Sequence, residues 1–147
     1  MKTLLVTGAS RGVGFEICKK ASADGHRVIA LSRNISPLKD IPNVNLFSVD
    51  LSLESEVVDF VEDISNSFKS IDVLINNAGS LINKPFLEIS SSDFEAVFKV
   101  NVFAVATLTR LMLPIINTKG HVLNITSMGG VQGSAKFPGL SAYSSSK

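Results

Sequence analysis

The chain has 147 residues, of which 45% are hydrophobic and 18% are charged, and its formal net charge is +1. This balance provides neither a basic stripe for a nucleic acid backbone nor a polybasic patch for a membrane surface, and a single cysteine, Cys18, excludes a scaffold held by internal disulfides. The longest apolar run, from Val102 to Ile116, is interrupted by polar residues and falls short of the roughly 18 to 20 residues of a membrane span, so we expect a soluble cytoplasmic protein.

Short apolar runs alternate with longer helical patterns in the first half of the chain. We predict strands at 3–7, 28–31, 44–49 and 72–75, and helices at 12–24 and 54–68. The second helix carries a core-facing stripe at Val57, Phe60, Val61 and Ile64. Strands that alternate with helices are typical of βαβ units around a parallel sheet.

The second half continues the same pattern with longer elements. A helical region is predicted at 91–117, with Ser91 or Ser92 as its N-cap. A fifth strand is predicted at 121–126, followed by a Gly- and Ser-rich loop at 128–141 and a helix from Ala142 onward. The whole pattern therefore predicts an α/β fold with a doubly wound parallel sheet.

Three glycines, Gly8, Gly12 and Gly14, follow the first strand in the spacing GxxxGxG. Backbone N–H groups at a helix N-terminus are unpaired, and the helix dipole favours an anion there. Doubly wound folds bind a nucleotide pyrophosphate between the first strand and the first helix. The same glycines would also suit a turn that leads into a helix and binds no ligand. The position of the turn after the first strand nevertheless favours nucleotide binding.

The end of the second strand suggests which nucleotide binds. Dinucleotide-binding folds that select an unphosphorylated ribose carry an acid about 20 residues after the glycines. Here the segment Ser32-Arg33-Asn34 has no acid. Arg33 and Arg11 are suited to a charge-assisted contact with a 2'-phosphate, which favours NADP(H) over NAD(H), although an exposed loop charge explains Arg33 equally simply.

Five segments resemble the motifs of the short-chain dehydrogenase/reductase family, in the same order. They are the TGxxxGxG turn at Thr7 to Gly14, the NNAG motif at Asn76 to Gly79, the helix asparagine Asn101, the strand-end Ser127, and the YxxxK motif at Tyr143 to Lys147. The resemblance covers essentially the whole chain and stops after the YxxxK motif, so the chain resembles an NADP(H)-preferring member that is truncated there.

This resemblance implies a Rossmann-like sheet with the first five of a usual seven strands. It makes 1–147 a single dinucleotide-binding domain, incomplete at its C-terminus. The implied function is an oxidoreductase that transfers a hydride between NADP(H), with NAD(H) less favoured, and a small carbonyl or alcohol. A homodimer or homotetramer is expected when full length. The charge balance gives no reason to expect a nucleic acid or membrane partner. No metal is expected either, since His26 and His121 are not spaced as metal ligands.

The resemblance and the glycine turn together assign the cofactor-binding residues. These are Gly8, Ser10, Arg11, Gly12, Val13, Gly14, Arg33, Asp50, Leu51, Asn77, Ala78, Gly79, Tyr143 and Lys147. The resemblance gives Asp50 a contact with adenine and places Asn77, Ala78 and Gly79 on the adenosine side.

The chemistry of the YxxxK motif can also be argued from its residues. Hydride addition to a carbonyl builds negative charge on oxygen, so a proton donor and a hydrogen-bond donor must converge there. Tyr143 is the only tyrosine. On a helix, residues four apart lie on the same face, so the Cβ atoms of Tyr143 and Lys147 would be roughly 6 Å apart. A cation near the phenol favours the ionised form of the phenol. By resemblance, Ser127 hydrogen-bonds the substrate oxygen, Lys147 holds the nicotinamide ribose, and Asn101 supports a proton path to Lys147.

Simpler explanations exist for single residues. Ser127 alone is explained by a strand-end cap, and Asn101 by a polar group satisfied within a helix. Two other functions stay open: a non-catalytic nucleotide-binding sensor, and an inactive fragment of such an enzyme. Ser127 and Tyr143 are also separated by a slightly longer segment than in most family members, and Gly133 to Leu140 is the expected extra loop.

Overall fold

A five-stranded parallel sheet runs through the molecule in the order β3-β2-β1-β4-β5. The computed structural model describes all residues, 1–147. Its strands are β1 (Thr3–Thr7), β2 (Arg27–Ser32), β3 (Val44–Ser48), β4 (Ile71–Asn76) and β5 (Ile116–Asn124). This order confirms the predicted doubly wound sheet. The strand order reverses between β1 and β4, and such a reversal opens a ligand crevice at the carboxyl ends of the two strands.

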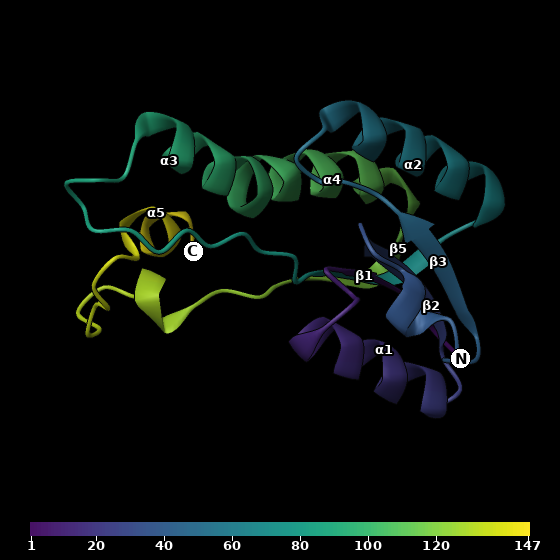
Figure 1. The fold of residues 1–147 in the computed structure, drawn as a ribbon. Helices are drawn as coiled ribbons and strands as arrows, with labels where there is room; N and C mark the ends of the chain where they lie inside the picture. Colours follow the sequence, from purple (N-terminus) through teal and green to yellow (C-terminus); the bar gives the residue numbers. More distant parts are fainter.

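Helices cover both faces of the sheet (Figure 1). Helix α1 (Gly12–Ala23) lies on one face, and α2 (Glu54–Ser67) lies with the long helical segment on the other. Side chains alternate between the two faces, so Leu5 joins one buried cluster and Val6 the other. Because both faces are covered, the strands read as nearly continuous apolar runs, which is why the first four were predictable.

The long helical segment is not one regular helix. It consists of α3 (Ser91–Phe98), a π-helical turn (Lys99–Phe103), α4 (Ala104–Met112) and a 3-10 turn (Leu113–Ile115). Its N-cap is Ser90, and the predicted Ser91 and Ser92 were wrong. The Ser90 hydroxyl accepts from the Asp93 amide while the Asp93 carboxylate accepts from the Ser90 amide, a reciprocal arrangement that fixes the first turn.

The boundary between this segment and β5 also differs from the prediction. The helix ends at Ile115 instead of residue 117, and β5 begins at Ile116 and ends at Asn124 instead of occupying 121–126. Ile116 already pairs with Ile71, after which the register shifts before His121 pairs with Val73. The bulge allows polar residues between these pairs to belong to the strand, and this hides the strand from a sequence pattern.

The segment Ser91–Ile115 is long and apolar enough to cross a membrane by length and composition alone, so the expectation that no segment reaches that length was wrong. That expectation considered only the apolar run that begins at Val102, whereas the whole segment from Ser91 passes this test. Leu108 and Met112 are buried in the same cluster as Leu74 of the sheet. Core packing explains these buried residues of the segment, whereas Phe103 and Leu113 are exposed.

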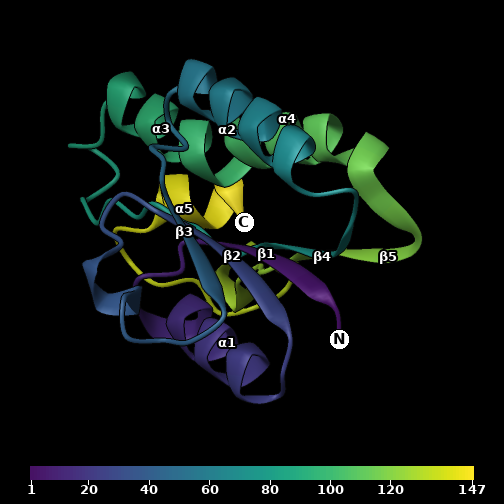
Figure 2. The ribbon, with the colours of Figure 1, turned by 90° about the vertical axis from the view of Figure 1, so that its right-hand side faces the viewer.

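The last elements lie beyond the carboxyl end of β5. A 3-10 turn (Met128–Gly130) follows the strand, and α5 (Ser141–Ser146) lies beside α3 (Figures 1 and 2). The predicted loop therefore contains one helical turn, and α5 begins one residue earlier than expected. This arrangement brings Lys147, which follows α5, next to Gly79 in the loop after β4.

Candidate active site

The glycine turn joins β1 to α1 at the carboxyl edge of the sheet. Gly8 and Gly12 adopt φ values of +63° and +58°, which favour glycine. A Cβ atom on Gly8 would lie 2.7 Å from the Ala78 Cα, and one on Gly14 would overlap the Asn77 side-chain amide. Gly12, in contrast, faces open space. Gly8 and Gly14 therefore allow the turn to touch the segment after β4, and Gly12 is on the open side.

Thr7 connects these two segments through its buried hydroxyl. Thr7 Oγ1 accepts hydrogen bonds from the backbone amides of Asn77 and Ala78, both at 3.0 Å. Asn77 Nδ2 donates in return to the carbonyls of Thr7 at 2.9 Å and Gly8 at 3.2 Å. The sequence prediction did not place Thr7 among the site residues. A hydroxyl at the end of an otherwise apolar strand was the available signal.

The N-terminus of α1 suits a phosphate group. Its N-cap residue, Arg11, makes no side-chain capping bond, and no acidic residue lies in the first turn. Val13 is exposed and Gly12 has free space around it. Uncapped N–H groups and the helix dipole together favour an anion there, so the residues present fit a pyrophosphate.

Polar residues at the ends of β2 and β3 form the neighbouring part of the site. Ser32 Oγ donates to Ser10 Oγ at 2.8 Å, which joins the residues that directly precede the exposed Arg33 and Arg11. Ser48 Oγ donates to the Arg33 carbonyl at 3.1 Å and holds its backbone. The two arginines thus extend from one hydrogen-bonded serine pair.

Asp50 lies next to this group, two residues after the end of β3. Its Oδ1 accepts hydrogen bonds from Ser52 N at 2.9 Å and Ser52 Oγ at 2.8 Å. These bonds, with a smaller contribution from the positive charge of Arg33, hold the pKa of Asp50 below its usual value. Leu51 is half-buried beside it. Asp50 is therefore an ionised acceptor near the predicted adenosine end.

Lys147 and Asn101 flank Gly79 at the other end of the crevice. A Cβ atom on Gly79 would lie 3.5 Å from Lys147 Nζ and 3.7 Å from Asn101 Oδ1. Lys147 Nζ donates to the Ile125 carbonyl at 3.0 Å, which leaves two of its N–H donors for a ligand. Partial burial lowers the pKa of Lys147.

Asn101 is buried in the π-helical turn, and its side chain joins three segments. Its Oδ1 accepts from Ser80 N at 2.7 Å, and its Nδ2 donates to Ser80 O at 2.9 Å and to Ser146 Oγ at 2.8 Å. The side-chain amide is therefore used to hold the loop after β4 against α5. Single π-turns within α-helices are frequent at functional sites, and no spacing in the sequence indicates this one.

Two glycines bring Ser127 close to α5. Ser127 Oγ accepts from Gly129 N at 3.1 Å, so its own proton is free for another acceptor. A Cβ atom on Gly129 would lie 3.0 Å from Ser144 Oγ, and one on Gly130 would overlap the Lys147 backbone. The turn after Ser127 therefore packs directly against the helix that carries Tyr143, although Ser127 and Tyr143 are not hydrogen-bonded to each other.

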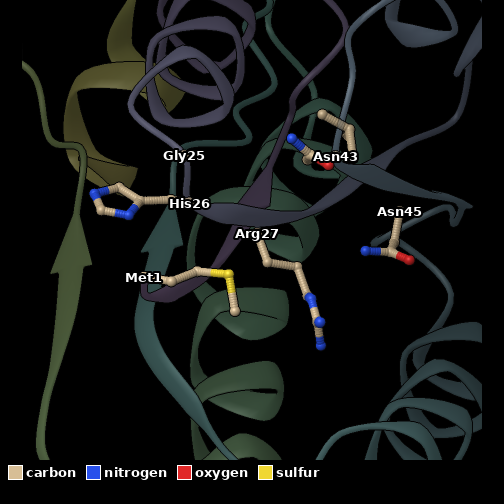
Figure 3. Close-up of a pocket in the computed structure, with 7 residues that line it drawn as sticks. Met1, Gly25, His26, Arg27, Asn43 and Asn45 are labelled. Atoms are coloured by element: carbon tan, nitrogen blue, oxygen red, sulfur yellow. The ribbon is translucent and has the colours of Figure 1, made fainter.

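Two cavities have linings that contain none of the predicted catalytic residues. One, of about 410 Å³, is at the start of β2 and β3, and its lining side chains, including His26, Arg27 and Asn45, do not converge on one point (Figure 3). It is at the amino edge of the sheet, whereas open α/β sheets bind ligands at the carboxyl edge. The other, of about 510 Å³, is lined by Ser141, Ser144 and Ser145 of α5 without Tyr143.

Comparison with known proteins gives a consistent result. The chain matches the family model described as short chain dehydrogenase over residues 2–147. It is 32% identical to the NADPH-dependent 1-acyldihydroxyacetone phosphate reductase of Saccharomyces cerevisiae, over 99% of this chain and 51% of that protein.

Solved structures of other proteins also resemble this chain over nearly its whole length. A short-chain dehydrogenase from Streptomyces avermitilis has a TM-score of 0.89 and 35% identity, over 99% of this chain and 55% of that one. A 4-hydroxyisoleucine dehydrogenase complexed with NADH has a TM-score of 0.88 and 28% identity, over 99% and 62%. The chain spans about half the length of the curated relatives it matches.

Proposed function

Because the chain belongs to the short-chain dehydrogenase family, we propose that the protein is an oxidoreductase that transfers a hydride between NADP(H) and a small carbonyl or alcohol. One observation carries this proposal. The turn after Ser127 packs against the segment bearing Tyr143 and Lys147, and Lys147 lies beside Gly79, whose neighbour Ala78 contacts the glycine turn at Gly8. We also propose that residues 1–147 act as one dinucleotide-binding domain.

The cofactor would lie across the carboxyl edge of the sheet. The amides of Gly12, Val13 and Gly14 would hold its pyrophosphate, and Asp50 and Leu51 would contact its adenine. Asn77, Ala78 and Gly79 would line the adenosine side, and Lys147 would hold the nicotinamide ribose. When bound, the nicotinamide supplies or accepts the hydride.

Proton transfer would fall to the side chains around the substrate oxygen. In the reducing direction, the Tyr143 hydroxyl donates its proton to that oxygen, whereas Ser127 donates a hydrogen bond and stabilises the developing charge. Lys147, four residues after Tyr143, would place a positive charge on the same side of the helix. Asn101 would keep Lys147 in place through Ser146 and would support a proton path to Lys147.

The preference for NADP(H) rests on Ser10 and Ser32, which join the segments bearing Arg11 and Arg33. An arginine contact with a 2'-phosphate is lost when Arg33 becomes an acid, which also repels the phosphate. Arg33→Asp should weaken NADPH binding far more than NADH binding in a fluorescence titration. Lys39→Asp, at another exposed position, is the control. Equal losses for the two cofactors would remove Arg33 from the phosphate site.

Turnover is tested on the intact protein by the loss of NADPH absorbance with a panel of ketones and aldehydes. Tyr143→Phe keeps the ring and removes the transferable proton, so we expect NADPH binding to persist and turnover to fall by roughly a hundredfold or more. Tight NADPH binding by the unaltered protein without turnover of any carbonyl would contradict the enzyme and favour a nucleotide-binding sensor.

We propose a cytoplasmic homodimer or homotetramer for the intact protein. Phe103 and Leu113, on the long helical segment, are 58% and 56% exposed, and such apolar side chains are suited to a subunit interface. Phe103→Glu should shift the mass measured by light scattering toward a monomer. An unchanged mass would exclude this surface.

A further inference from the structure

Lys136, in the loop between β5 and α5, uses its ammonium group in an unusual way for an exposed lysine. Its Nζ donates to the Gly129 carbonyl at 2.8 Å, the Val131 carbonyl at 2.7 Å and Ser134 Oγ at 2.9 Å. An ammonium group has three N–H donors, so all three are satisfied within this loop. An exposed lysine is ordinarily solvated, and these bonds fold the loop back onto the turn at Met128–Gly130.

One of these bonds reaches the residue that fixes Ser127. Gly129 accepts from Lys136 through its carbonyl and donates through its amide to Ser127 Oγ at 3.1 Å. Because the Gly129 amide occupies a lone pair on Oγ, it restricts the directions in which the Ser127 proton can point. The position of Gly129 therefore determines where Ser127 can donate.

The same turn is confined on its other side by α5. A Cβ atom on Gly130 would overlap the Lys147 backbone, and one on Gly129 would be in tight contact with Ser144 Oγ at 3.0 Å. Lys136 holds the turn from the loop, and α5 holds it from the site. Loss of Lys136 would leave the Gly129 carbonyl to water, whereas the Val131 carbonyl would keep its bonds from Ser134, so the restraint on Gly129 would be removed on one side only.

We propose that Lys136 is a positioning residue, which aligns the Ser127 hydroxyl with the substrate oxygen through Gly129. This inference rests on the proposed function, since it concerns the hydrogen bond that Ser127 donates during hydride transfer. A donor must be placed where negative charge develops, and small displacements reduce its effect on the transition state.

The kinetic test uses Lys136→Met in the intact protein, because methionine keeps most of the side-chain length without the ammonium group. We expect kcat to fall by about three- to tenfold, as for a lost hydrogen bond, with little change in KM for NADPH. Lys136→Arg keeps charge and donors and should restore part of the loss. Lys119→Met, at an exposed position on β5, is the matched control.

A double variant separates positioning from an independent effect. If Lys136 acts through Ser127, Lys136→Met should add no further loss to Ser127→Ala. Losses that multiply in the double variant would overturn the proposal. So would a kcat of Lys136→Met equal to that of Lys119→Met.

A measurement without turnover tests the contact itself. In protein labelled with ¹⁵N-glycine, the Gly129 amide should exchange its proton several-fold faster in Lys136→Met than in Lys119→Met. Unchanged exchange would overturn the proposal even if activity fell. If the unaltered protein turns over no carbonyl, the proposed function fails together with the role of Lys136 in turnover, and the exchange rates decide the contact alone.

Discussion

Replacement of Thr7 by valine should destabilise the protein strongly, although the two side chains have nearly the same shape. Thr7 is 1% exposed, and its hydroxyl accepts hydrogen bonds from two backbone amides, those of Asn77 and Ala78, at 3.0 Å. Valine would leave the Ala78 amide without a partner, whereas the Asn77 amide would keep only its bond to the Ile75 carbonyl at 3.1 Å. An unsatisfied N–H group costs about 1 to 3 kcal/mol and the lost second bond adds about 1 kcal/mol, so a total of about 2 to 4 kcal/mol is the expected loss in the free energy of unfolding.

This loss should be visible in urea denaturation followed by circular dichroism. With a shift of about 2 to 4 °C per kcal/mol for a protein of this size or somewhat larger, Tm should fall by roughly 4 to 16 °C. NADPH binding should weaken as well, because the same bonds hold the glycine turn against the segment after β4.

Two control variants isolate the hydroxyl. Thr7→Ser keeps the acceptor and removes one methyl group, so it should cost only about 1 kcal/mol. Thr118→Val, at an exposed position on β5, should cost less than about 0.5 kcal/mol. If Thr7→Val destabilised the protein no more than Thr7→Ser, the two amides would not depend on this hydroxyl and the reasoning would be refuted.

Three further predictions concern the turn after β5, the amino edge of the sheet and the start of α3. Gly130→Ala should abolish turnover and lower Tm, because its Cβ would overlap the backbone of Lys147, the residue after α5. Activity equal to that of the unaltered protein would show that the turn can move away. Several contacts hold the pKa of Asp72 below its usual value, and the hydrogen bond from the Thr3 amide has the largest effect. The carboxylate therefore stabilises the fold above pH about 4, and this contribution is lost as pH falls through the lowered pKa. Asp72→Asn should therefore reduce stability at neutral pH and flatten its decrease as the pH falls below about 4 in urea titrations. Parallel curves for the two proteins would contradict this. The ammonium of Lys84, with smaller contributions from Ser90, lowers the pKa of Asp93 to about 2. Lys84→Met should therefore raise the pKa of Asp93 toward about 3.9 in an NMR titration of the carboxyl carbon. A pKa that stays near 2 would exclude the ion pair as the cause.

The fold class and the order of the first elements could be predicted because their causes are local. Buried parallel strands are continuous apolar runs, and the stripe on α2, from Val57 to Ile64, follows the period of a helix. The glycine turn was predictable for the same reason, because positive φ values and an open helix N-terminus depend on a few consecutive residues.

The element boundaries were less accurate where the deciding partner is distant in sequence. The strand β5 begins at Ile116 because Ile71 pairs with it across a bulge, and the polar residues that follow give no strand pattern. Three consecutive serines are equally good N-caps by type. Ser90 caps α3 because Asp93 lies at the position that reciprocates its bond.

The residues expected to act were identified by their motifs, but what holds them was decided by the tertiary structure. Asn101 lies in a π-turn whose side-chain amide joins Ser80 to Ser146, and Lys136 reaches Ser127 only through Gly129. By itself, the sequence determined which chemical groups are present and which local turns they favour. Contacts between the loops after β4 and β5 and the helix α5 arise only when sheet and helices pack together, so only the folded chain could decide them.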